Sequence, residues 1–205
     1  MNNKWLKWAA ELQSLAQAGL AFCVNDYDRD RYERIRNLSI EIMHEYTDID
    51  NGKIRELFAS ETGYQTPKVD VRAVIIENDK ILLIKEKVDG KWSLPGGWAD
   101  VNTSVGESAV KESMEEAGAT VRPTRIIAIQ LANKHNNPNF PYTIYKIFVE
   151  CDLIDISFRE NTETLGSDFF PPDALPPLSS DRNTVQQIEM CFNAKKCQVF
   201  ETIFD

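Results

Sequence analysis

The sequence has few of the residues and patterns that are typical of disulfide-linked, zinc-binding or membrane-spanning proteins. Its 205 residues include 4 cysteines, which are scattered and form no C-x-x-C pair. We therefore expect free thiols, without a zinc site or a disulfide framework. No apolar run reaches membrane-spanning length, and residues 1–22 lack a basic segment followed by a continuous apolar one. These absences favour a protein that stays in the cytoplasm and contacts no membrane.

Positive charge is also scarce. The chain carries 23 Lys and Arg against 32 Asp and Glu, a net charge of −9. Broad binding to nucleic acid needs clustered cations that replace phosphate counterions, so we expect no duplex nucleic acid as a partner. A small nucleotide bridged by metal ions remains compatible, and a short RNA end is not excluded, because bound ions reverse the local charge.

Residues 1–66 and 67–205 have different patterns and predict two regions. In the first region, apolar residues recur at helical spacing at Trp5, Trp8, Leu12, Leu15 and Ala16, and again at Ile35, Leu38, Ile42 and Tyr46. Residues 53–60 can form a third helix, and turn residues from Gly63 to Pro67 mark the boundary. Such helices cannot bury their apolar faces alone. We favour a homodimer, with packing inside one chain as the alternative.

One helix in the second region has clear start and stop signals. Ser104 and Glu107 fit the S-x-x-E capping box, which predicts a helix starting near Val105. Gly118 suits a left-handed C-cap, so the helix should end near Ala117. Upstream, residues 92–97 read as a strand that runs into a tight glycine turn, where a ligand can approach the backbone.

Three glutamates, Glu112, Glu115 and Glu116, share one face of this predicted helix. Like charges at such spacing repel one another unless a cation lies between them. Oxygen ligands suit hard ions such as Mg²⁺, which is usually shared with a substrate phosphate. A solvated acidic face is the simpler alternative, but the adjoining glycine turn favours a metal site and a phosphate substrate.

This unit resembles the signature of the Nudix hydrolases, G-x5-E-x7-R-E-U-x-E-E-x-G-U, in which U is aliphatic. The matching positions are Gly97, Glu112, Glu115, Glu116 and Gly118, whereas Thr103 and Lys111 replace the early glutamate and the arginine. The resemblance implies an α/β/α sandwich with a mixed sheet. Strands at 69–76, 80–85, 125–130 and 142–149 and a helix at 183–192 are consistent with that fold.

The resemblance also implies an activity and its residues. The reaction is hydrolysis of a nucleoside diphosphate linked to another group, supported by Mg²⁺ or Mn²⁺. The implied metal ligands are Glu112, Glu115, Glu116 and a backbone carbonyl at Gly96. The general base varies among relatives. Glu112, Glu115 and the later Glu163 are therefore the catalytic candidates.

The helical start, followed by residues 68–73 and 90–101, resembles a group of Nudix proteins from Gram-positive bacteria. That group includes CDP-choline pyrophosphatases and proteins called ADP-ribose pyrophosphatases. It implies hydrolysis of CDP-choline to CMP and phosphocholine. ADP-ribose or a nucleotide sugar is the alternative substrate, and a non-catalytic nucleotide-sensing module is the alternative of another class. The candidates for substrate binding are Arg72, Trp98, Lys134, His135 and Tyr142, with Phe140 beside them.

Overall fold

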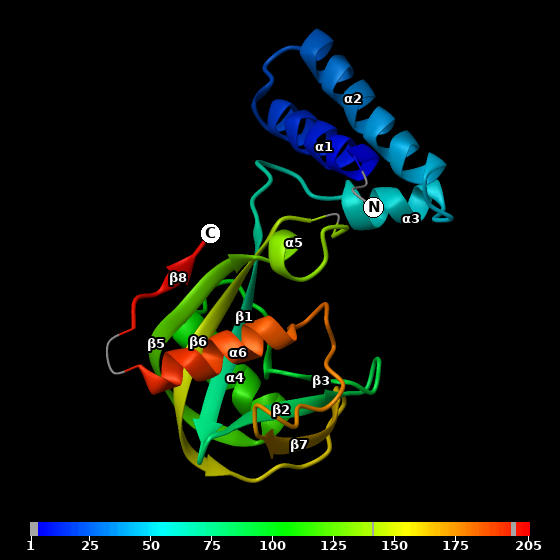
Figure 1. Ribbon diagram of the computed structural model, residues 1–205. Coiled ribbons are helices and arrows are strands. Elements are labelled where there is room, and N and C mark those ends of the chain that lie inside the picture. The colour runs from blue at the N-terminus through cyan, green and yellow to red at the C-terminus, as the bar shows by residue number, and fades with distance from the viewer. Residues whose placement is uncertain (1–3, 141, 198–199) are drawn as a thin grey trace. The chain divides into compact units, whose positions relative to one another are not determined.

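The computed structural model describes residues 4–140, 142–197 and 200–205. The chain divides into two compact units (Figure 1). A helical unit contains Met1–Pro67 together with Pro138–Thr143, and a sheet unit contains Lys68–Asn137 together with Ile144–Asp205. The short segment 138–143 is thus grouped with the helices, although the chain on either side of it belongs to the sheet unit.

The helical unit contains the three helices that the sequence predicts. They are α1 (Lys4–Phe22), α2 (Asp26–Glu45) and α3 (Asn51–Phe58). Asn25 and Asp50 cap the second and third helices by accepting hydrogen bonds from backbone N–H groups of the first turn. Their shared core contains Leu6, Ala9, Ile40, Met43, Ile54, Phe58 and Ala59. Within the described ranges, no helix is both long enough and apolar enough to cross a membrane.

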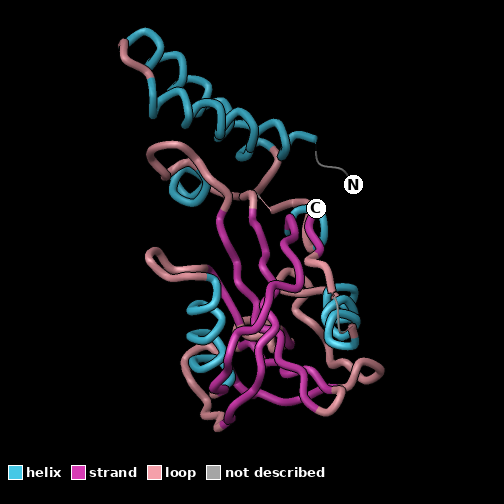
Figure 2. Tube along the Cα trace, turned by 90° about the vertical axis from the view of Figure 1, so that its left-hand side faces the viewer, coloured by secondary structure: helices cyan, strands magenta, loops and turns pink. Residues whose placement is uncertain are grey.

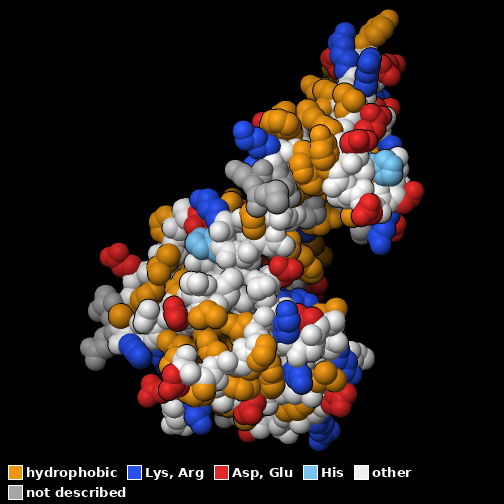
Figure 3. Space-filling view, turned by 45° about the vertical axis from the view of Figure 1, so that its right-hand side comes forward, with side chains coloured by type: hydrophobic (Ala, Val, Ile, Leu, Met, Phe, Trp, Pro, Cys, Tyr) orange, Lys and Arg blue, Asp and Glu red, His pale blue; other side chains and the backbone are white. Residues whose placement is uncertain are grey.

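The faces that pack in this unit differ from the predicted ones. Trp8 and Leu15 of α1 are 59% and 58% exposed, and an apolar groove lined by Trp8, Glu11, Leu12, Leu15 and Ile42 lies on the surface. Figure 3 shows hydrophobic side chains gathered on this unit among charged ones. The small Ala9 and Ala16 are fully buried. The periodicity therefore identified the helices correctly and their packing in part: Ala16 is buried and Trp5 packs against the core, whereas Trp8 and Leu15 face solvent.

Within the described residues, the sheet unit contains eight strands. They are β1 (Lys68–Glu77), β2 (Lys80–Glu86), β3 (Trp92–Ser93), β4 (Gly96–Trp98), β5 (Ala119–Leu131), β6 (Ile144–Ile156), β7 (Thr164–Phe170) and β8 (Ile203–Phe204). The main order is β3-β2-β1-β6-β5-β8, with β4 on β1 and β7 on β2. The β1–β6 pair is parallel and the β1–β2 pair is antiparallel, so the sheet is mixed. Asn78 and Asp79 form the predicted hairpin turn, with φ of 49° and 57°.

Helices cover both faces of this sheet (Figure 2). On one face, α4 (Val105–Ala117) packs Ala109 and Ala117 against Val71, Ala73 and Ile75 of β1. On the other face, α6 (Val185–Lys196) contributes Ile188, Cys191 and Phe192 to a core with Val74 and Ile76. A short helix, α5 (Ala132–His135), follows β5. The expected α/β/α sandwich with a mixed sheet is confirmed.

Strand alternation also assigns the polar residues of β1 to a face. Because side chains along a strand point alternately to opposite faces, Asp70 and Arg72 project from the same face as Val74, which packs with α6. Gly96 of β4 pairs with Arg72 in the sheet register. The glycine turn therefore lies at the edge of the sheet, next to α4. It is also next to Asp70 and Arg72, whose side chains are on the sheet face that α6 covers.

Candidate metal centre and active site

The acidic helix α4 forms as its sequence predicts. The Ser104 hydroxyl accepts a hydrogen bond from Glu107 N at 3.2 Å, and the Glu107 carboxylate accepts one from Ser104 N at 2.8 Å. Gly118 ends the helix in the left-handed conformation, with φ of 64°. A Cβ atom at that position would overlap the carbonyl oxygen of Ser157, so glycine is required there. These two caps fix where the three glutamates leave the helix.

The glycine turn is held tightly against β1. Gly96 has φ of 143°, and a Cβ atom on it would overlap the carbonyl oxygen of Val71. Ala73 N donates to Pro95 O at 2.8 Å, which ties the turn to the same strand. The segment expected as one strand and a turn is in fact two short strands, β3 and β4, separated by Leu94 and Pro95. This arrangement places the Gly96 backbone beside α4.

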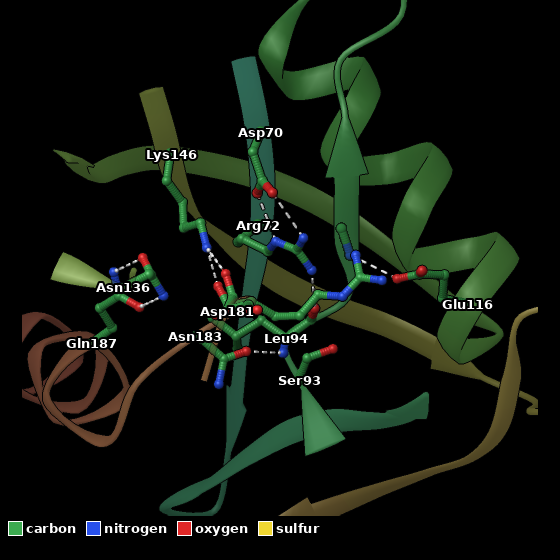
Figure 4. Close-up of polar contacts among 12 residues, drawn as sticks. Asp70, Arg72, Ser93, Leu94, Glu116, Asn136, Lys146, Asp181, Asn183 and Gln187 are labelled. Atoms are coloured by element: carbon green, nitrogen blue, oxygen red, sulfur yellow. Dashed lines mark hydrogen bonds and ion pairs between the residues drawn. The ribbon is translucent and has the colours of Figure 1, made fainter. Parts of the chain in front are cut away.

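Glu116 joins α4 to the turn. Its carboxylate oxygen Oε2 accepts a hydrogen bond from Gly96 N at 2.7 Å, and the residue is only 6% exposed (Figure 4). Burial raises the pKa of Glu116 to about 7, and the charges of Glu112 and Glu86 act in the same direction. The Gly96 hydrogen bond and Arg72 oppose this increase without cancelling it. A buried carboxylate that is destabilised in this way is a good ligand for a cation.

Glu112 and Glu115 lie on the same side of α4 but in different surroundings. The Glu112 side chain is 13% exposed, and burial raises its pKa, with the charges of Glu115 and Glu163 adding to the increase. Glu115 is 59% exposed. Lys111 Nζ lies 4.0 Å from Glu112, 3.8 Å from Glu115 and 2.7 Å from Asp100. Lys111 therefore pairs most closely with Asp100, and Glu107, one turn before it, is used in the helix cap.

The loop that carries Glu163 is attached to the C-terminal end of α4. Asn161 Nδ2 donates to the backbone carbonyl of Glu115 at 2.8 Å, and Thr164 Oγ1 donates to that of Glu116 at 2.9 Å. Asn161 Oδ1 also accepts from Glu163 N at 2.9 Å. Glu163 is exposed, and its charge reaches Glu112 and raises the pKa of that carboxyl. The structure therefore places Glu163 beside the acidic helix.

The donor set suits a divalent metal ion that keeps open coordination positions. Within the described residues, no three Asp, Glu, His or Cys side chains form a ready-made metal cage. Mg²⁺ normally binds through one or two carboxylates, with waters and substrate phosphates completing its shell. Glu112 and Glu116 have raised pKa values, so a bound cation would stabilise their negative charges. The backbone of the glycine turn lies next to them. The residues present thus fit such an ion.

Two candidates for substrate binding lie near the turn. Trp98 of β4 is 53% exposed and follows Gly97 directly. Arg72 is only 1% exposed, and its three guanidinium nitrogens are all used: Nε and Nη2 donate to Asp70 at 2.7 and 2.9 Å, and Nη1 donates to Leu94 O at 3.1 Å. This geometry leaves Trp98 free to contact a ligand and favours a positioning role for Arg72.

The remaining candidates lie elsewhere. Lys134 and His135 belong to α5, and His135 Nε2 lies 2.7 Å from the Asp205 carboxylate. In Figure 4, the neighbouring Asn136 lies on the opposite side of Arg72 from Glu116. Tyr142 is half-buried and belongs to the helical unit. The structure therefore brings together Gly96, Trp98 and the four glutamates, and it does not gather Lys134 and His135 around them.

Sequence reasoning missed several polar residues that support the site. Lys146 is 1% exposed inside β6, and Asn183 is fully buried just before α6. A lysine within the apolar run of β6 was a usable signal, because buried lysines are rare unless paired. Asn183 gave no local signal, since Leu94 is 89 residues away. Asn161 accepts from the nearby Glu163 N and Thr164 N, a local turn pattern that does not reveal its contact with Glu115, 46 residues away.

Comparison with known proteins identifies relatives for both units. Residues 3–58 match a family described as a UDP-X-like, N-terminal oligomerisation domain, and residues 66–188 match the family described as the NUDIX domain. A Bacillus subtilis protein, YjhB, whose assignment as an ADP-ribose pyrophosphatase is provisional, is 43% identical over 100% of this chain and 99% of its own length.

Two crystal structures are similar as well. An ADP-ribose pyrophosphatase from Streptococcus suis is 46% identical, with a TM-score of 0.64, and covers 68% of this chain and 100% of its own. A UDP-X diphosphatase is 31% identical, also with a TM-score of 0.64, and covers 98% of both chains.

Proposed function

The chain belongs to the Nudix family and is a pyrophosphatase of that family, and from this premise we propose that it hydrolyses the diphosphate bond of a nucleoside diphosphate linked to a second group. The observation that carries this proposal is the pair Glu112 and Glu116. Both are carboxylates of raised pKa on one helix, and Glu116 is hydrogen-bonded to the Gly96 backbone. A cation that carries a bound diphosphate would offset the negative charges of these two carboxylates.

We assign the metal ligands to Glu112, Glu115, Glu116 and the backbone carbonyl of Gly96. Mg²⁺ or Mn²⁺ bound there supplies charge neutralisation for the diphosphate and lowers the pKa of the attacking water. Glu116 is held by Gly96 N, so its second oxygen is available. Glu115 is exposed and completes the acidic face toward solvent.

Glu163 is our first choice for the general base, with Glu112 and Glu115 as the alternatives on the helix. It is exposed to solvent, and Asn161 holds its loop against α4. A carboxylate there can accept the proton of a water that attacks phosphorus, provided that it comes within hydrogen-bond reach of that water. The neighbouring Glu160 is engaged with Lys87 at 3.3 Å, which favours Glu163.

CDP-choline is our first candidate substrate. The sequence pattern around the glycine turn favours it, and the exposed indole of Trp98 offers a face for a quaternary ammonium group. ADP-ribose is the second candidate, because YjhB and the Streptococcus suis protein both carry that substrate in their names. We assign Lys134 and His135 to outer parts of the ligand, since they are not gathered at the metal ligands.

Product analysis distinguishes these substrates. Purified protein with Mn²⁺ is given CDP-choline and ADP-ribose separately, and the products are followed by ³¹P NMR. A higher kcat/KM for CDP-choline, with CMP and phosphocholine as products, supports the first candidate. AMP and ribose phosphate formed with the higher kcat/KM establish the second. Cleavage outside the diphosphate bond of either compound contradicts the proposed reaction.

We further propose that the chain forms a homodimer through the exposed groove of the helical unit. Apolar side chains such as Trp8 and Leu15 are otherwise left in water, and residues 3–58 match an oligomerisation family. Leu15→Glu should yield monomers in sedimentation experiments, whereas Tyr27→Glu, at an 80% exposed position of α2, should leave dimers. Monomers in the unsubstituted protein contradict this assignment. We place the protein in the cytoplasm, where its free cysteines would persist as thiols.

A further inference from the structure

The backbone of Leu94 is held on both sides by distant side chains. Leu94 O accepts a hydrogen bond from Arg72 Nη1 at 3.1 Å, and Leu94 N donates to Asn183 Oδ1 at 2.7 Å (Figure 4). Leu94 and Asn183 are both fully buried. Water cannot replace either bond at such a site, so the loss of one partner leaves a buried polar group unsatisfied.

Hydrogen bonds to the backbone also hold the next two residues of the turn. Pro95 O accepts from Ala73 N at 2.8 Å, and Gly96 N donates to Glu116 at 2.7 Å. The backbone is therefore fixed continuously from Leu94 to Gly96. Arg72 and Ala73 belong to β1 and Glu116 to α4, whereas Asn183 comes from the segment before α6.

Asn183 is itself held in place by its neighbours in the chain. Lys146 Nζ donates to the carbonyl oxygens of Asp181 and Arg182 (Figure 4). Arg182 Nε lies 3.2 Å from the buried Glu86 carboxylate. Ser179 N donates to Trp92 O at 2.9 Å, two residues before Leu94. These contacts connect segment 179–183 to the sheet, so the Asn183 side chain approaches Leu94 from a fixed position.

Capping of α6 does not explain the presence of Asn183. The N-cap is Thr184, whose hydroxyl accepts from Gln187 N at 3.3 Å while the Gln187 side chain accepts from Thr184 N. Asn183 Nδ2 has no hydrogen-bond partner within the described part of the chain. Among the described residues, the hydrogen bond of the Asn183 side chain therefore goes to the turn, through Oδ1.

We propose that Asn183 is a positioning residue for the metal-binding turn. The Asn183 side chain accepts a hydrogen bond from the Leu94 amide, which fixes the backbone of Leu94 and Pro95. It thereby sets the direction of the Gly96 backbone and of the Glu116 carboxylate that is hydrogen-bonded to Gly96. This inference rests on the proposed metal role of Gly96 and Glu116. It adds to the metal site a supporting residue from the C-terminal half of the chain, 67 positions after Glu116 in the sequence.

Three variants test this role in the full chain. Asn183→Ala removes the acceptor, and Asn183→Asp keeps an oxygen at the same position. Ile188→Val trims a fully buried side chain of α6 and controls for a general loss of stability. Mn²⁺ binding is measured by water-proton relaxation, and the Leu94 and Gly96 amides are observed by NMR in the metal-free protein. Steady-state kinetics give kcat and KM separately.

Asn183→Ala should weaken Mn²⁺ binding about tenfold, the usual effect of losing one buried hydrogen bond. It should also speed hydrogen exchange at the Leu94 amide, shift the Gly96 resonance and lower kcat more than it raises the substrate KM. Asn183→Asp should restore most of the Mn²⁺ affinity. Ile188→Val should leave affinity, amide signals and kcat unchanged.

The results separate failure of this inference from failure of the proposed function. If the unsubstituted protein binds Mn²⁺ but Asn183→Ala binds it equally tightly, with an unchanged Gly96 resonance, the positioning role is refuted and the metal site stands. Equal losses in Asn183→Ala and Ile188→Val refute it too, because general destabilisation would explain both. If the unsubstituted protein binds no Mn²⁺, the proposed metal site fails and this inference fails with it.

Discussion

The substitution Glu116→Gln should stabilise the metal-free protein while abolishing metal-dependent hydrolysis. Glu116 is 6% exposed and its pKa is raised from 4.5 to about 7, chiefly by burial. Glutamine has nearly the same shape, and its carbonyl oxygen can still accept the Gly96 N–H. The variant therefore removes a buried negative charge that destabilises the folded protein, and it keeps the hydrogen bond from Gly96 N that holds the turn.

The sign of the effect follows from proton linkage. A carboxyl whose pKa is higher in the folded state binds its proton more tightly there, so its ionisation lowers stability as the pH rises toward about 7. At 1.36 kcal/mol per pKa unit, the advantage of glutamine should be roughly 1 kcal/mol at pH 5.5 and roughly 3 kcal/mol at pH 8.5. The buried Lys146, whose pKa is lowered to about 7, titrates in both proteins and cancels in the difference.

Urea unfolding in EDTA at these two pH values measures the difference. Glu189→Gln makes the same chemical change at an exposed position of α6, and should alter stability by no more than about 0.5 kcal/mol. Mn²⁺ at 100 times its Kd should then stabilise the unsubstituted protein by about 2.7 kcal/mol, and stabilise Glu116→Gln far less. A metal-free Glu116→Gln protein that is less stable than the unsubstituted protein at pH 8.5 would show that the Glu116 charge does not destabilise the fold. Equal Mn²⁺ stabilisation of both proteins would show that Glu116 is not a metal ligand.

Three further substitutions test other parts of the site. Glu163→Gln should lower kcat by about 10² to 10⁴ while leaving Mn²⁺ affinity unchanged; Glu160→Gln in the same loop is the control, and a larger loss there would move the base to Glu160. Lys111→Met removes the ammonium 4.0 Å from Glu112 and should raise the pKa of that carboxyl, so the acid limb of the pH–kcat profile at low salt should move to higher pH. An unmoved limb contradicts this. Trp98→Ala should raise the KM for CDP-choline about 2- to 30-fold, the range of a cation–π contact; an equal rise for ADP-ribose would show that Trp98 does not recognise choline.

The local parts of this protein could be predicted from sequence. The start and end of α4 were correct because Ser104, Glu107 and Gly118 act within the helix itself. On the face of α4 toward the sheet, Ala109, Ser113 and Ala117 are buried, whereas the apolar Met114 is 47% exposed. Which apolar positions pack closely depends on the sheet, which is built from distant segments.

The support of the site could not be predicted in this way. Arg72 was a candidate for substrate binding, but its partners Asp70 and Leu94 enclose it within the fold. Asn183 bonds to Leu94 N and Asn161 to the carbonyl of Glu115, and only the tertiary structure brings these distant backbone groups near. Periodicity placed Trp8 and Ala16 on one apolar face of α1, and it could not show that Ala16 is buried inside the unit while Trp8 is left exposed.

The most direct test of metal-dependent hydrolysis is a Mn²⁺ titration of EDTA-treated protein, with release of nucleoside monophosphate followed on CDP-choline, ADP-ribose, NADH and a short RNA. We expect product to appear on at least one nucleoside diphosphate derivative as Mn²⁺ is added. Glu189→Gln should retain this turnover, and Glu116→Gln should abolish it. Mn²⁺ binding without turnover on any of the four would contradict the proposed hydrolysis and favour a domain that senses nucleotides.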